Sequence, residues 1–134
     1  MIKYKILEEK DLDIDSDLFL GKENLSYFLK ENNTCAFIAV KENEIIGFAY
    51  GYILLRPDGE KDFYMHSIDI IDKYQGKGYG TKLMNFILGY ISDIGCRELF
   101  LITNKNNVQA CKCYKKSGGI TVSDDDIVYI FNSI

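Results

Sequence analysis

The amino-acid sequence predicts a mixed α/β fold, with a twisted mixed sheet of about seven strands flanked by about four helices. Two observations predict this class. The first half of the chain is rich in short segments in which apolar residues recur at every second position, as in half-buried strands. The second half contains a strand, a glycine-rich loop, a helix and another strand, which is the order of a βαβ unit with parallel strands and a right-handed crossover.

The chain is expected to begin with one strand, followed by one or two short helices. Residues 2–6 alternate apolar or aromatic side chains with lysines, which is a strand pattern. Residues 11–33 are more polar and carry apolar residues at helical spacing. Asp15 or Ser16 is available as a helix N-cap.

Two hairpins are predicted next. Residues 34–40 and 44–55 are rich in apolar and aromatic residues, and the polar residues 41–43 between them indicate a turn. Residues 56–59, Arg-Pro-Asp-Gly, predict a second turn, because proline fixes φ and glycine tolerates positive φ. The strand after this turn is expected over residues 62–71.

The helix after the glycine-rich loop is predicted from its apolar stripe. Leu83, Ile87, Ile91 and Ile94 recur at helical spacing, and Gly95 is placed to end the helix. The pattern predicts a helix of about four turns.

The rest of the chain completes the predicted sheet. An apolar strand is expected over residues 98–103, and residues 104–107 are expected to cap a helix over 108–117. Two glycines at 118–119 would stop this helix. A closing hairpin is predicted over residues 120–131, around an acidic turn.

Length and composition favour a single domain over residues 1–134. The chain has 134 residues, with 47% hydrophobic and 27% charged residues, which is the balance of a globular protein with one core. No signal peptide and no membrane span is recognised in the sequence. The net charge of −4 argues against a nucleic-acid-binding surface and suits a cationic partner better.

Cysteine usage favours a reduced, cytoplasmic protein without a metal site. The four cysteines lack the spacing of zinc ligands. They are Cys35, Cys96, Cys111 and Cys113.

The glycine-rich loop predicts a binding site for a pyrophosphate. The run from Gln75 to Gly80 reads Gln-Gly-Lys-Gly-Tyr-Gly and lies between a predicted strand and a predicted helix. Glycines let the backbone approach a ligand closely, and the N-terminus of a helix favours negative charge. Thr81 stands where the dinucleotide-binding fingerprint needs its last glycine, and the loop also lacks the pattern of a P-loop.

Two motifs together make the chain similar to the GNAT superfamily of N-acetyltransferases. The first is Q/R-x-x-G-x-G/A, met by Gln75, Gly78 and Gly80 after a strand that contains Ile68-Asp69-Ile70. The second is an asparagine and a tyrosine on the following helix, met by Asn107 and Tyr114. The family usually has an aromatic residue where this chain has Gly119.

The resemblance implies a fold of the GNAT type that binds acetyl-CoA between two splayed parallel strands. Backbone N–H groups of residues 77–81 would hold the pyrophosphate, and the main chain of residues 68–70 would pair with the pantetheine arm. No metal is needed for this chemistry. The expected cofactor-binding residues are Ile68, Asp69, Ile70, Gln75, Gly76, Lys77, Gly78, Tyr79, Gly80, Thr81 and Asn107.

Two residues are expected to be catalytic. Tyr114 matches the family's tyrosine that protonates the leaving thiolate of CoA, although a helical tyrosine is also common in a core. His66 is the only histidine in the sequence, and histidine is a residue type that often serves as a general base. Its side chain is expected to share a strand face with Tyr64 and Ile68, where a base could deprotonate the acceptor amine. A surface role for His66 is equally open, and Tyr64 or a water could replace it.

The acceptor is left open by the sequence. Within the superfamily the chain is most similar to the class I aminoglycoside 3-N-acetyltransferases, which implies a cationic small-molecule acceptor. An alternative acceptor is a protein N-terminus or lysine. An alternative function is that of a non-catalytic acyl-CoA-binding module. A homodimer is possible. Acidic groups at Asp13, Asp15, Asp17 and residues 124–126 could bind a polycation, but they are also expected in solvated turns.

Overall fold

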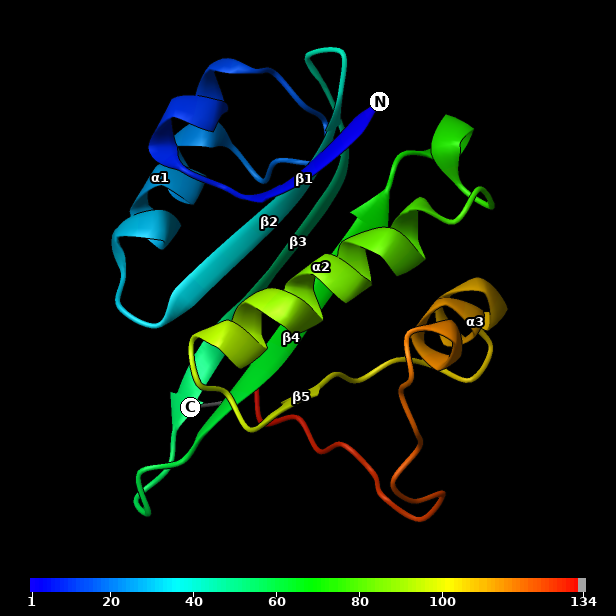
Figure 1. Ribbon diagram of the computed structural model, residues 1–134. Helices are drawn as coiled ribbons and strands as arrows, with labels where there is room; N and C mark the ends of the chain where they lie inside the picture. The colour runs from blue at the N-terminus through cyan, green and yellow to red at the C-terminus, as the bar shows by residue number, and fades with distance from the viewer. Residues whose placement is uncertain (133–134) are drawn as a thin grey trace.

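The computed structural model describes residues 1–132 and contains a five-stranded sheet with the order β1-β2-β3-β4-β5 (Figure 1). Strands β1 to β4 are antiparallel neighbours, whereas β4 and β5 are parallel. This arrangement confirms the mixed sheet, both predicted hairpins and the parallel βαβ pair. The strands are β1 (Ile2–Ile6), β2 (Thr34–Lys41), β3 (Glu44–Leu55), β4 (Lys61–Ile70) and β5 (Glu98–Phe100).

Helices cover the sheet from two sides. Helix α2 runs along one face of the sheet, with α3 beside it, and α1 lies on the other face near β2 (Figure 1). The helices are α1 (Lys22–Lys30), α2 (Tyr79–Asp93) and α3 (Val108–Lys116), and short 3₁₀ turns occur at η1 (Glu9–Asp13) and η2 (Asp72–Tyr74). The prediction of about seven strands and four helices is therefore wrong in number, although the class is right.

The missing strands are those of the predicted closing hairpin. Residues 119–132 form neither helix nor strand. The large apolar residues at Ile120 and Val122 and across residues 127–131 are each between 65% and 92% exposed. An apolar alternation becomes a strand only where a neighbouring strand can pair with it. Strand β5 is only three residues long, so it offers little edge for such pairing.

The start of α1 also differs from the expectation. Its N-cap is Gly21, and neither Asp15 nor Ser16 caps it. The Ser16 hydroxyl instead accepts a hydrogen bond from the backbone N–H of Leu18 at 3.1 Å. The carboxylate of Asp15 forms an ion pair with Lys22 in the first turn of α1. Both polar side chains thus shape the loop before the helix.

Each face of the sheet buries its own apolar cluster. On the α2 side, Phe37 and Phe63 are fully buried against Leu83 and Ile87 of the helix. On the α1 side, Ile38 and Phe48 pack with residues that include Leu25. Neighbouring residues of one strand point to opposite faces, so Phe37 and Ile38 serve different clusters.

A β-bulge in β4 changes which residues of this strand point to each face of the sheet. Tyr50 pairs with Ser67, but the next residue of β3, Gly51, pairs with Met65, so His66 is an extra residue in β4. The extra residue shifts the alternation by one position. Ile68 consequently packs into the same cluster as Met65. The expectation that His66 shares a face with Ile68 is wrong for this reason.

Gly51 is expected to be the glycine least tolerant of a side chain. A Cβ at this position would lie 2.3 Å from the carbonyl oxygen of Tyr64 and 2.7 Å from the ring of Phe63. We expect Gly51→Ala to lower the free energy of unfolding by about 1–3 kcal/mol, measured by urea denaturation.

A Cβ added to Gly89, an exposed residue of α2, would meet no atom within 4 Å. Gly89→Ala should therefore raise the free energy of unfolding by about 0.5–1 kcal/mol. Equal effects of the two substitutions would contradict this packing.

No helix within residues 1–132 is both long and apolar enough to span a membrane.

Candidate active site

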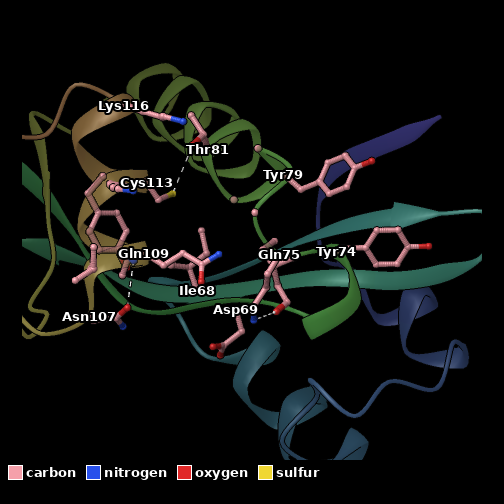
Figure 2. A pocket seen from close by; sticks show the side chains of 18 residues that line it. Ile68, Asp69, Tyr74, Gln75, Tyr79, Thr81, Asn107, Gln109, Cys113 and Lys116 are labelled. Carbon is pink, nitrogen blue, oxygen red and sulfur yellow. Dashed lines mark hydrogen bonds between the residues drawn. The ribbon is translucent and has the colours of Figure 1, made fainter.

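The candidate active site is a cleft that opens where β5 leaves β4. The two strands pair only from Asp62–Glu98 to Tyr64–Phe100, and within residues 1–132 the remaining length of β4 has no neighbour on that side. A cleft of about 660 Å³ lies there, between the end of β4, the loop before α2 and one side of α3 (Figure 2). Its volume lies in the range of small-molecule and cofactor sites, about 300–1,000 Å³.

The loop before α2 is shaped to receive an anion. Gly76 and Gly78 have φ angles of 75° and 88°, and no atom lies within 4 Å of a Cβ built on either residue. Gly78 is the N-cap of α2 and has no side chain that could accept from the first N–H groups of the helix. These N–H groups lack acceptors inside the helix, and the helix dipole adds positive potential. The loop therefore offers an open set of hydrogen-bond donors.

Gln75 braces this loop against the end of β4. Its side-chain Nε2 donates to the carbonyl oxygen of Ile70 at 2.8 Å and to Oδ1 of Asp72 at 3.2 Å. These bonds tie the loop to the strand on one side and to η2 on the other. The glutamine thus fixes the direction in which the glycines face the cleft.

Helix α3 forms the opposite wall of the cleft. Asn107 is its N-cap, as predicted, and its Oδ1 accepts from the backbone N–H of Ala110 at 3.2 Å. The Thr81 hydroxyl of α2 lies 3.8 Å from Sγ of Cys113, which links the two helices across the cleft (Figure 2). The cap and this contact hold α3 in a fixed position relative to the loop.

Tyr114 lines the cleft and is partly buried against the α2-side cluster. Burial is the main cause that raises its pKa above the ordinary 10.0, and the charges of Cys113 and Asp69 act in the same direction. The phenol therefore keeps its proton at neutral pH. A protonated hydroxyl in a cleft can serve as a hydrogen-bond donor or as a general acid.

Most of the residues predicted for cofactor binding are brought together here. Lys77 is the exception, because it does not line the cleft and its Nζ lies 5.8 Å from the centre of the Tyr74 ring. The predicted residues that do line the cleft are Ile68, Asp69, Ile70, Gln75, Gly76, Gly78, Tyr79, Gly80, Thr81, Asn107 and Tyr114.

His66 lies outside the cleft. Its ring is exposed and stacks on Tyr50, with ring centres 5.3 Å apart, and meets the edge of Tyr64 at 5.6 Å. The aromatic rings of these residues lie on the face of the sheet that carries α1, because Tyr50 packs against the α1-side cluster. The histidine therefore lies on the opposite face of β4 from Ile68.

Sequence reasoning missed several residues of the cleft. For the six that are on α3 the signal is helical spacing, since positions three and four apart lie on one helix face, whereas Tyr74 is in η2 and has no such signal. The additional lining residues are Tyr74, Val108, Gln109, Ala110, Lys112, Cys113 and Lys116.

Comparison with known families gives the class of protein, an acetyltransferase. The model of the acetyltransferase (GNAT) family matches residues 4–119 of the chain. The chain belongs to this family, and it is an enzyme that transfers an acetyl group to an amine.

Individual relatives are similar to the chain over most of its length. Spermine/spermidine N(1)-acetyltransferase of Bacillus subtilis (strain 168) is 26% identical, and the match covers 76% of both chains. An aminoglycoside acetyltransferase from an uncultured soil metagenomic sample, solved with sisomicin, has a TM-score of 0.81 at 20% identity and covers 99% of this chain and 96% of its own. The aminoglycoside N-acetyltransferase AAC(6')-Iy, solved with CoA, has a TM-score of 0.81 at 16% identity and covers 100% and 96%. These two structures show the likeness of fold.

Proposed function

We propose that the protein transfers the acetyl group of acetyl-CoA directly to a primary amine of a cationic acceptor, within a ternary complex. The observation that carries this proposal is the cleft itself, which is lined both by an open loop of backbone donors and by Tyr114. The residues of the cleft fit the cofactor. Backbone N–H groups at the start of α2 suit a pyrophosphate, and the unpaired edge of β4 suits an extended amide chain.

The binding residues are assigned by position. Residues 77–81 would hold the pyrophosphate through backbone N–H groups, and the main chain of residues 68–70 would pair with the pantetheine arm. Gln75 and Asn107 act indirectly, since their side chains fix the loop and the start of α3. Lys77 contributes positive charge near the loop from outside the cleft.

Acetyl-CoA supplies an activated thioester when it is bound. As the acceptor nitrogen forms its bond to the acetyl carbon, the carbon–sulfur bond breaks and the sulfur takes a proton. Tyr114 is positioned to donate this proton from its hydroxyl, because it lines the cleft and stays protonated. No covalent intermediate with the protein is required.

The attacking amine must first lose a proton, because only a free lone pair can form the new bond. His66 is exposed on the α1-side face of β4, where its imidazole would accept the proton of the acceptor amine directly or through a bound water. We assign it this role, with the acceptor arriving from the face opposite α2. The donor and the acceptor then meet at the gap beside β4.

A thiol-release assay with acetyl-CoA tests the function. The amine panel should include spermidine, an aminoglycoside and a lysine-containing peptide, with CoA affinity measured in parallel by calorimetry. We expect rapid release with at least one cationic small molecule and little with the peptide. Release with the peptide alone would favour a protein acetyltransferase. CoA binding without release for any amine would leave only an acyl-CoA-binding module.

A further inference from the structure

Asp69 is placed at the junction of the two sides of β4. Its neighbours Ile68 and Ile70 pack into the α2-side cluster, so the side chain of Asp69 points toward the opposite face. Asp69 nevertheless lines the cleft (Figure 2), as Tyr114 also does. Asp69 is therefore the carboxylate that borders both the donor cleft and the face from which the acceptor arrives.

The carboxylate of Asp69 has unused capacity to accept hydrogen bonds. It is exposed and accepts one bond within residues 1–132, from the Ser67 hydroxyl to Oδ2 at 3.1 Å. None of the ion pairs in this part of the chain includes it. An ionised carboxylate has about four lone-pair sites, so most of them are available to a ligand.

A row of aromatic rings extends from this carboxylate over the sheet. Tyr50 stacks with His66 at 5.3 Å, and Tyr52 stacks with Tyr64 at 6.5 Å between ring centres. The row continues to Phe100 of β5, whose ring centre lies 5.2 Å from that of Tyr64. The faces of such rings attract cations and also pack well against methylene groups.

A second cavity continues the row beneath α1. It has a volume of about 220 Å³ and a mostly apolar lining. Tyr50 and Tyr52 belong both to the aromatic row and to this cavity. In the pairing of β3 with β4, Phe48 lies opposite Asp69 and Tyr50 lies opposite Ser67, so Tyr50 and Asp69 are diagonal neighbours on the α1-side face of the sheet. The lining residues are Leu20, Asn24, Leu25, Phe28, Phe48, Tyr50 and Tyr52.

We propose that the acceptor is an elongated amine, that Asp69 binds its reacting ammonium group beside Tyr114, and that its remaining chain lies over Tyr50 in the cavity beneath α1. This inference rests on the proposed function and names the acceptor class and its binding residues. Asp69 is a positioning and specificity residue in this scheme. The proton leaves the bound ammonium group to His66 or water before attack.

The other acidic groups of the chain suit this role less well. Asp15 is already paired with Lys22, and Asp124 lies 3.5 Å from Nζ of Lys105. Neither residue lines the cleft. Asp69 is better placed, since it combines a free carboxylate with a position next to the reaction site.

Steady-state kinetics of Asp69→Asn with a series of linear α,ω-diamines tests the proposal. The backbone and the size of the side chain are kept, so only the charge is removed. We expect KM for the diamines to rise about tenfold to a hundredfold, because a charge-assisted hydrogen bond is lost. The values of kcat and of KM for acetyl-CoA should change by less than about threefold. Asp69→Glu should restore much of the diamine affinity.

Two further variants separate the parts of the proposed site. Tyr50→Leu should raise KM for long diamines more than for short ones, since it removes the ring that leads into the cavity. Asp93→Asn is the matched control, because Asp93 is an exposed aspartate at the end of α2 and outside the cleft, and its KM values should equal those of the wild type.

Several outcomes would overturn the inference. It is wrong if Asp69→Asn and Asp93→Asn behave alike, or if Asp69→Asn loses acetyl-CoA affinity as strongly as diamine affinity. It is also wrong if diamine length does not matter in the wild type. Failure of the proposed function gives a different result, because the wild type would then acetylate neither the diamines nor any amine of the thiol-release panel.

Discussion

Tyr114→Phe is expected to lower kcat by about a hundredfold to ten-thousandfold while CoA affinity stays within about twofold of the wild type. The hydroxyl lines the cleft and keeps its proton, whereas the ring is partly buried against the α2-side cluster. Phenylalanine preserves the ring and removes only the acid. Stopped-flow thiol release and calorimetric titration with CoA measure the two quantities separately.

Tyr90→Phe is the matched control for this experiment. Tyr90 is also partly buried against the α2-side cluster, but it does not line the cleft. Its substitution should leave kcat nearly unchanged. Tyr114 is not the acid if both variants retain full turnover. An alkaline decline of the wild-type rate that is absent in Tyr114→Phe should lie above pH 10.0, because the pKa of Tyr114 is raised from that value.

Gly78→Val is expected to raise the Kd of CoA by about a hundredfold. The φ angle of Gly78 is 88°, a region that costs a residue with a side chain about 1–2 kcal/mol. Relief of this strain would turn the first N–H groups of α2 away from the cleft. The added side chain would also project into the open side of the loop, where no atom lies within 4 Å.

Gly59→Val controls for the strain alone. Gly59 has a φ angle of 87°, also without an atom within 4 Å of its Cβ position, but it lies in the turn between β3 and β4. Both substitutions should lower the free energy of unfolding by similar amounts, and only Gly78→Val should weaken CoA binding in calorimetry. Equal CoA affinity of the two variants would argue against a pyrophosphate at this loop.

The loop and the two helices that line the cleft could be predicted from the sequence because their signals are local. The glycines at 76, 78 and 80, the apolar stripe of α2 and the cap at Asn107 each depend on residues close together in the chain. A helix cap or a positive φ is specified within a few residues. For this reason the loop, α2 and the start of α3 form as the sequence predicts.

The features that the sequence did not predict depend on contacts between segments that are distant in the chain. The bulge at His66 is a property of the pairing between β3 and β4, and the alternation within β4 alone does not reveal it. The alternation over residues 120–131 indicates a hairpin, but it does not specify a partner, and in the structure these residues pair with no strand. Local patterns also do not show that Asp69 and Tyr50 lie close together.

The extra residue at His66 has an evolutionary consequence. Up to the bulge, the rings of Tyr64 and His66 lie on the α1-side face of the sheet. After the bulge, Ile68 and Ile70 pack into the α2-side cluster beside the cleft. An exchange at Tyr64 would change the ring that the proposed acceptor meets, while Ile68 and Ile70 continue to hold the strand edge beside the cleft. One strand thus contains two halves that can vary separately, and a single substitution at Tyr64 is expected to change the acceptor preference while the residues of the cleft are kept.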